Sequence, residues 1–172
     1  MAIKNRPEFQ KFIRRVEKSS DEFRASSTEK RHSKQYRTAR ENLAYLADQD
    51  SFLEFGQFAV AAQRSRRDYE ELQDKTNADG IITCFCSVNS GLVGSESSQA
   101  VAIVYDYSVL AGTQGAFHHL KLDRICDQAK KFELPIVIFT EGGGGRPGDT
   151  DVLIQIAGLH ICLLYTSDAA DE

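Results

Sequence analysis

Apolar residues near the start of the chain recur with the period of an amphipathic helix. Over residues 7–24 they fall near helical spacing, at Phe9, Phe12, Ile13, Val16 and Phe23. A second stretch with this spacing covers residues 37–48. The residues between these two stretches, 25–35, are polar and predict a loop. Residues 48–59 begin with turn-forming residues and then predict a short strand.

The middle of the chain changes from helical spacing to continuous apolar runs. Residues 63–79 carry many charges without a clear period, which predicts a connection at the surface. The pair Asp79-Gly80 is a turn signal, and two runs rich in Ile, Val and aromatic residues follow it, at 81–88 and 100–110. Such runs are typical of strands that are buried on both faces of a sheet. A polar loop is expected between them.

A strand–helix–strand unit is predicted next. Residues 115–132 have helical spacing, and the helix should end before Pro135 because proline disfavours a helical conformation in the residue that precedes it. The apolar residues 136–140 then predict a third strand. A helix of about five turns between two strands is typical of a crossover that joins parallel strands. The glycine-rich segments 111–115 and 142–148 both follow strands, so they could share one end of the sheet, where such folds bind ligands.

The four consecutive glycines Gly142 to Gly145 are the strongest chemical signal in the chain. Without side chains in the way, successive N–H groups can converge on one oxygen atom, which suits an oxyanion hole or a phosphate site. The Lys-Ser/Thr ending of a Walker loop is missing. The segment does contain G-x-G-x-x-G, interrupted by Pro147, so a dinucleotide site stays open as an alternative. A flexible turn is the purely structural alternative.

Charge is distributed unevenly along the chain. Residues 1–40 hold 12 Lys and Arg against 5 Asp and Glu, whereas residues 41–172 hold 9 against 20. A basic arm on an acidic body can indicate a polyanionic partner, but the interspersed acids also fit a solvated helix. Aromatic residues do not interleave with the basic residues as they do in single-strand nucleic-acid platforms, so we expect no nucleic-acid partner.

The four cysteines, Cys84, Cys86, Cys126 and Cys162, lack the spacing of a zinc site, and we expect no metal. Cys84 and Cys86 should point to the same face of a strand as buried thiols. No apolar stretch approaches the ~20 residues of a membrane helix, so no membrane association is expected. Because residues 1–10 also lack the apolar run of a secretory signal, the expected location is the cytoplasm, with an organelle matrix as the alternative.

Four segments, taken in order, resemble the carboxyltransferase subunits of biotin-dependent propionyl-CoA, acetyl-CoA and related acyl-CoA carboxylases. TARENLAYLADQDSFLEFG (38–56) is similar to the family's opening motif, and DGIITCFCSVNSGLV is similar to its DGVVTG strand. VYDYSVLAGTQGAFHHLKLDRICDQA resembles the family's glycine-rich turn followed by a helix with His and Lys. VIFTEGGGGRPGD resembles the strand that leads into SGGAR. The resemblance spans about residues 36–160.

This resemblance implies an α/β fold, crotonase/ClpP-like, with repeated β-β-α units and a helical N-terminal arm. We therefore expect a basic helical arm over residues 1–35 and a partial, acyl-CoA-binding carboxyltransferase domain over residues 36–162. The acidic ending at 163–172 does not continue the preceding pattern and is expected to be a non-native tail. Because the family has a second, homologous catalytic domain, the chain is expected to be an N-terminal fragment that is inactive alone.

The resemblance also implies the site residues. In the family, paired glycines before Ala-Arg give their N–H groups to the thioester carbonyl of the acyl-CoA. Aligned on Arg146, these catalytic glycines are Gly143 and Gly144 here, with Gly145 in place of the alanine and Gly142 in place of the serine. The residues expected to contribute to substrate binding are Gly112, Gly115, Lys121, Arg146 and Arg40.

Three single residues leave alternatives open. Lys121 could meet a CoA phosphate, or it could be a solvated surface residue. His118, which matches the family's His, is expected to hold its helix to a loop by hydrogen bonding. Glu141 would be the general acid if the chain were a crotonase-type acyl-CoA hydratase or isomerase, which is the main alternative function. A nucleotide-binding module without enzymatic activity is the other.

The activity implied by the resemblance is transfer of a carboxyl group from carboxybiotin to an acyl-CoA. Carboxybiotin releases CO₂, the biotin enolate takes the α-proton of the acyl-CoA, and the acyl enolate attacks CO₂. Two oxyanion holes stabilise the enolates, with each donor contributing ~3 kcal/mol. The expected partners are a biotin carboxyl carrier, a biotin carboxylase component and further copies of the chain in a homo-oligomer.

Overall fold

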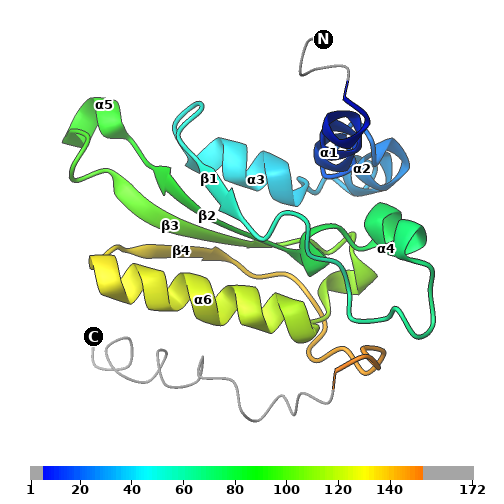
Figure 1. Cartoon of the computed structure of the whole chain (residues 1–172). Coiled ribbons are helices and arrows are strands. Elements are labelled where there is room, and N and C mark those ends of the chain that lie inside the picture. Colours follow the sequence, from blue (N-terminus) through cyan, green and yellow to red (C-terminus); the bar gives the residue numbers. More distant parts are fainter. Residues whose placement is uncertain (1–5, 153–172) are drawn as a thin grey trace.

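The structure, a computed structural model, describes residues 6–152 as a four-stranded sheet with helices on both faces (Figure 1). The expected tail at 163–172 and Cys162 lie outside the described residues. None of the described helices is long and apolar enough to cross a membrane. In chain order the elements are α1 (Pro7–Glu17), α2 (Ala25–His32), α3 (Ala39–Leu46), β1 (Leu53–Phe55), α4 (Tyr69–Lys75), η2 (Asn77–Gly80), β2 (Ile81–Ser87), α5 (Ser90–Val93), β3 (Gln99–Tyr105), η3 (Leu110–Gly112), α6 (Ala116–Phe132) and β4 (Ile136–Phe139).

The strands lie side by side in the order β1-β2-β3-β4. The first three are antiparallel neighbours, whereas β3 and β4 run parallel, with Val101 opposite Ile136 and Val104 opposite Phe139. The parallel pair is joined through α6, which has 17 residues. The predicted strand–helix–strand crossover is therefore confirmed. Because parallel strands point the same way, the segments that follow β3 and β4 emerge at the same edge of the sheet.

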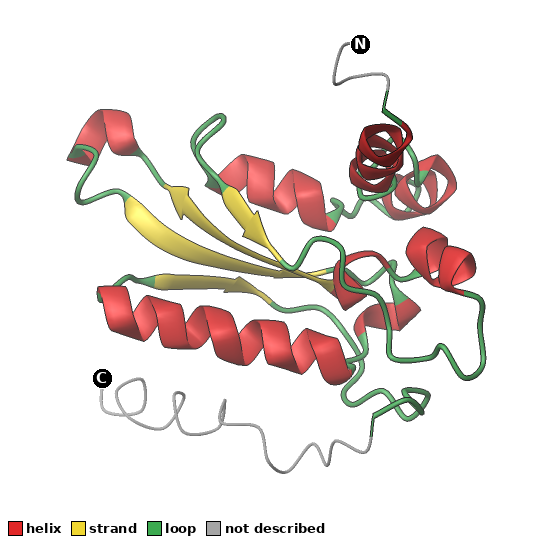
Figure 2. Ribbon diagram, viewed as in Figure 1, coloured by secondary structure: helices red, strands yellow, loops and turns green. Residues whose placement is uncertain are grey.

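The sheet is covered on both faces, by α3 on one side and α6 on the other (Figure 2). Alternate residues of β2 and β3 therefore enter two separate core clusters, which explains why both strands are continuously apolar. Cys84 and Cys86 share the α3 face as buried free thiols, as predicted. The α3 cluster is Ala39, Leu43, Ile82, Cys84, Cys86, Ala100, Ala102 and Val104. The α6 cluster is Ile81, Val101, Ile103, Leu122, Ile125, Cys126 and Ala129.

Two predictions for the first 35 residues were wrong. Helix α1 ends at Glu17 rather than near residue 24, because both the N–H and the hydroxyl of Ser19 donate to the Val16 carbonyl, at 3.0 and 2.6 Å, and close a turn there. The polar segment expected to be a loop contains helix α2 instead. This helix buries none of its residues, so it has no apolar stripe from which it could have been predicted.

The segment expected to be a surface connection, 63–79, is also partly helical and partly buried. It contains α4, whose single buried residue Leu72 packs with Val60 and Ala61. All four residues of η2 are buried as well. One buried apolar residue in seven does not produce a recognisable period, which is why the sequence pattern did not predict this helix. The loop expected between β2 and β3 contains the short helix α5.

Candidate functional site

The two glycine-rich segments meet at the edge of the sheet beyond the carboxyl ends of β3 and β4. Gln114, in the segment after β3, forms a parallel bridge with Gly145, in the segment after β4. The Gln114 N–H donates to the Gly144 carbonyl, and the Arg146 N–H donates to the Gln114 carbonyl, both at 2.8 Å. The prediction that both segments share one end of the sheet is confirmed.

Gly112 and Gly142 allow the main chains of the two segments to touch. A Cβ atom on Gly112 would overlap the Glu141 carbonyl oxygen and would lie 2.8 Å from the Gly142 Cα atom. A Cβ atom on Gly142 would overlap the Gly112 carbonyl group in the same way. Gly112 also has a φ angle of +66°, which L-residues with side chains rarely adopt. Glycine is therefore required at both positions by close approach of the backbone.

Gly143 and Gly144 present open main-chain donors. Both are exposed, and within residues 6–152 neither N–H group donates a hydrogen bond to a protein acceptor. A Cβ atom on Gly144 would meet nothing within 4 Å, and one on Gly143 would reach only the Thr113 methyl group, at 4.0 Å. The carbonyl of Gly144, in contrast, is held by Gln114. The loop thus has a fixed edge and, beside it, N–H groups that are free to bind an oxygen atom of a ligand.

A buried ion pair fixes the residue that follows the glycines. The guanidinium of Arg146 contacts the carboxylate of Asp79, which is fully buried in η2, and also donates to the Thr113 carbonyl at 2.7 Å. The second Asp79 oxygen accepts the His118 N–H at 2.7 Å. Burial raises the pKa of Asp79 above its ordinary value, although the neighbouring Arg146 acts in the opposite direction.

Gly115 makes room for this ion pair. A Cβ atom at Gly115 would overlap both the Arg146 guanidinium and the carboxylate of Asp149, which lies 3.5 Å from that guanidinium. Asp149 also accepts the Ala116 N–H at 2.9 Å, at the first residue of α6. Arg146 therefore joins three parts of the chain: the glycine loop, the start of α6 and the turn before β2.

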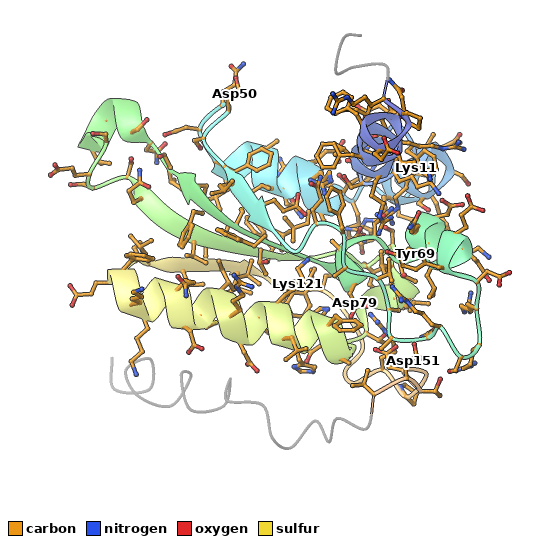
Figure 3. All side chains as sticks on the ribbon, in the orientation of Figure 1. Lys11, Asp50, Tyr69, Asp79, Lys121 and Asp151 are labelled. Atoms are coloured by element: carbon orange, nitrogen blue, oxygen red, sulfur yellow. The ribbon has the colours of Figure 1, made fainter. Side chains whose placement is uncertain are left out.

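Lys121 belongs to the same buried network, beside the turn that carries Asp79 (Figure 3). Its ammonium donates to the carbonyls of Ala78, at 2.8 Å, and Ile81, and its aliphatic part lies over Gly56. Desolvation by burial lowers its pKa to about 8. Lys121 is therefore not the solvated surface residue that was one of the two alternatives, and its link to substrate stays a prediction.

His118 and Arg40 also contact the protein itself. His118 is fully buried, and burial lowers its pKa to about 3. Its main-chain N–H donates to the Asp79 carboxylate and its ring Nδ1 lies 3.3 Å from the Asp79 carbonyl oxygen, so it joins α6 to η2. Arg40 makes two hydrogen bonds to Glu54 of β1, at 3.0 and 3.3 Å, and one to the Ser19 carbonyl at 2.5 Å. These contacts lie away from the glycine loops.

The structure therefore brings most of the predicted residues together, namely Gly112, Gly115, Gly143, Gly144 and Arg146. Two residues of the site were missed as such in the sequence. Asp79 was interpreted only as part of a turn, and Asp149 only as part of a glycine-rich segment. Asp79 could have been recognised from its position two residues before a buried strand. A charge there is costly unless it is paired, so a basic partner would have been expected.

The fold and this loop are similar to those of a class of proteins, the crotonase-fold carboxyltransferases. A single-chain, multi-domain long-chain acyl-CoA carboxylase matches with a TM-score of 0.87 and 44% identity, covering 93% of this chain and 16% of that one. Transcarboxylase 12S, in a structure with methylmalonyl-CoA and methylmalonic acid bound, matches with a TM-score of 0.65 and 25% identity, over 87% of this chain and 27% of that one. The predicted crotonase-like α/β fold is confirmed.

Curated relatives in sequence agree with this class. The methylmalonyl-CoA decarboxylase subunit alpha of Veillonella parvula is 30% identical over 118 residues, which are 69% of this chain and 21% of that protein. The acetyl-CoA carboxylase carboxyl transferase subunit beta of Clostridium kluyveri is 32% identical over 114 residues, 63% of this chain and 37% of that protein. No family model matches the chain.

The chain is related in sequence and fold to the carboxyltransferase subunits of acyl-CoA carboxylases, as its motifs indicated. It spans 21% and 37% of the length of the two curated relatives named above.

Proposed function

We propose that this chain forms the acyl-CoA side of a carboxyltransferase, which transfers a carboxyl group from carboxybiotin to the α-carbon of an acyl-CoA. The observation that carries the proposal is the pair of open N–H groups at Gly143 and Gly144, held at the carboxyl ends of the parallel strands. The relationship to acyl-CoA carboxylases supplies the substrate class.

The glycine N–H groups would act on the thioester carbonyl. Removal of the α-proton moves negative charge onto that oxygen, and two preorganised donors stabilise the resulting enolate more than the starting ester. Because no side chain covers Gly143 or Gly144, the thioester can approach their N–H groups closely. Thr113 is the side chain nearest to Gly143, and its hydroxyl already donates to the Leu110 carbonyl at 2.7 Å, which suits chemistry that proceeds through an enolate rather than through a side-chain nucleophile.

The remaining predicted residues would serve substrate binding by fixing the shape of the site. Gly112 and Gly115 permit the close packing of the two loops, and Arg146 anchors the glycine loop to Asp79. Lys121 holds the turn that carries Asp79, through the Ala78 carbonyl. We assign Arg40 to the attachment of the helical arm on β1, since its contacts are with Glu54 and Ser19.

Carboxybiotin, when bound, supplies the carboxyl group. Among residues 6–152 one glycine loop has donors of the required kind, and we assign it to the acyl-CoA. The biotin group would therefore be held by a second domain, and the working enzyme would need that domain, a biotin carboxyl carrier and a biotin carboxylase. A homo-oligomer is the expected assembly, and a hexamer has been described for transcarboxylase 12S. On this basis residues 36–162 are a partial acyl-CoA-binding domain, preceded by a basic arm over 1–35.

Gly143→Val tests the proposal in the assembled carboxylase. Valine keeps the N–H group, and its Cβ has room beside Thr113, but its side chain blocks the approach of the thioester oxygen. We expect kcat/KM for acyl-CoA carboxylation to fall by roughly 10²- to 10³-fold, the usual cost of losing an oxyanion donor. Gly91→Val in α5 is the matched control, because a Cβ there has room as well and meets no other atom within 4 Å. Unchanged turnover in Gly143→Val would contradict the proposal.

The hydratase alternative predicts that Glu141 acts as a general acid. Both of its carboxylate oxygens accept hydrogen bonds from Arg31, at 2.6 and 2.7 Å, so Glu141 is engaged in an ion pair within the protein. If the unaltered protein hydrates an enoyl-CoA and the Glu141→Gln variant loses this activity, the hydratase alternative would be favoured over carboxyl transfer.

A further inference from the structure

The glycine run has no side chains of its own, so its position depends on the residues at its two ends. At the far end Arg146 is bound to Asp79. At the near end Glu141, directly before Gly142, is bound by Arg31 of α2, 110 residues earlier in the chain. The two terminal guanidinium nitrogens of Arg31, Nη1 and Nη2, each donate to a different Glu141 oxygen, at 2.6 and 2.7 Å.

The Arg31 side chain is held in place before it meets Glu141. Its Nε and Nη2 atoms donate to the Arg37 carbonyl, at 3.0 and 2.6 Å. Its guanidinium lies 5.3 Å from the ring centre of Tyr36 and 5.8 Å from that of Tyr107, within the range of cation–π contact. Although Glu141 is 36% exposed, Arg31 is only 12% exposed. Because the Arg31 guanidinium is already immobilised by these contacts, it loses little conformational entropy when it binds a carboxylate. The side chains of a typical surface ion pair lose more.

Helix α2 is itself tied to the same edge of the sheet. Arg24, at the start of α2, forms an ion pair of 2.6 Å with Asp106, which directly follows β3, and also donates to Ser108. One arginine at each end of α2 therefore contacts the residues that follow β3 and β4. This also accounts for two of the arm's positive charges, which face the protein rather than a polyanionic partner.

We propose that Arg31 is a positioning residue, which fixes through Glu141 the point where the glycine loop leaves β4. Resting on the proposed function, this means that the helical arm sets the distance and direction of the Gly143 and Gly144 donors. The arm would then be part of the catalytic unit, although none of its residues needs to touch the substrate.

Amide hydrogen exchange of the whole chain tests this inference without any ligand. The Gln114 N–H reports on the loop, because its acceptor is the Gly144 carbonyl. The Val101 N–H, bonded to the Pro135 carbonyl at 2.9 Å, reports on the opposite end of β3. In Arg31→Gln we expect the Gln114 amide to exchange roughly 3- to 10-fold faster, with no change at Val101. Arg31→Lys keeps the positive charge but not the two parallel N–H donors of the guanidinium. Its Gln114 exchange rate should therefore lie between those of the unaltered chain and Arg31→Gln.

Lys30→Gln is the matched control, since it removes the same charge from the preceding position of α2, where no ion pair occurs among the described residues. It should leave the Gln114 exchange rate unchanged. Unchanged Gln114 exchange in Arg31→Gln, or equal acceleration at Val101, would overturn the inference. Binding of a nonhydrolysable acyl-CoA thioether to the unaltered chain tests the proposed function separately. If the unaltered chain does not bind this ligand but Arg31→Gln still accelerates exchange at Gln114, the positioning role is supported and the proposed function is rejected.

Discussion

The two ion pairs at the ends of the glycine run use the same chemistry in different surroundings. Asp79 and Arg146 have side chains that are 0% and 3% exposed, whereas Glu141 and Arg31 are 36% and 12% exposed. A buried pair depends on both partners, because removing one leaves the other charge without water. A pair open to solvent contributes little to global stability but can still determine where a loop lies. The comparison therefore separates stability of the fold from placement of the site.

The largest effect is expected from breaking the buried pair. Asp79 has a φ angle of +50°, which asparagine tolerates as well as aspartate, so Asp79→Asn removes the charge without new backbone strain. The Arg146 guanidinium would then keep only the more distant Asp149 carboxylate, at 3.5 Å, so the free energy of unfolding should fall by about 3–5 kcal/mol. Urea unfolding followed by circular dichroism measures this loss. The double variant Asp79→Asn/Arg146→Met should lose less than the single one, and a loss below about 1 kcal/mol for Asp79→Asn would contradict a structural role.

An intermediate effect is expected from acid, through His118 beside Asp79. The pKa of His118 is about 3 in the folded chain, below the ordinary value of 6.5 that it regains on unfolding. Between these values the unfolded chain binds the proton and the folded chain does not, so stability is complete above pH 6.5 and falls as the pH decreases toward 3. The loss should approach about 1 kcal/mol per pH unit. Urea unfolding between pH 7 and 4.5 measures this slope, which should become shallower in His118→Gln, and an unaltered slope would show that other groups cause it.

The smallest effect on global stability is expected at the exposed pair. Arg31→Gln should change the free energy of unfolding by less than about 1 kcal/mol, as is usual for pairs near solvent, even though it accelerates exchange at Gln114. The same urea titration provides the measurement. A loss as large as that of Asp79→Asn would mean that Arg31 holds the whole fold and not the loop alone.

The sequence predicted the elements whose signal is local. Strands β2 and β4 and helix α6 were placed within about one residue, whereas β3 begins where predicted but ends at Tyr105 rather than at residue 110. The strands are recognisable as continuous apolar runs because both faces of the sheet are covered, and α6 is recognisable by its helical spacing. Helix α2 was missed, because it buries none of its residues and is held by arginines that reach distant carboxylates. Helix α4 was missed because Leu72 is its only buried residue.

The sequence by itself determined the crossover, the glycine run and its location after a strand, since these follow from residue order and from what glycine permits. Only the tertiary structure decided which charges meet there. Arg146 pairs with Asp79, 67 residues away, and Arg31 pairs with Glu141, 110 residues away. No local period encodes such pairings, because they depend on how β2, β3 and α6 place distant turns side by side. For the same reason Lys121, which could equally have been a surface residue, has its ammonium bound to buried main-chain carbonyls.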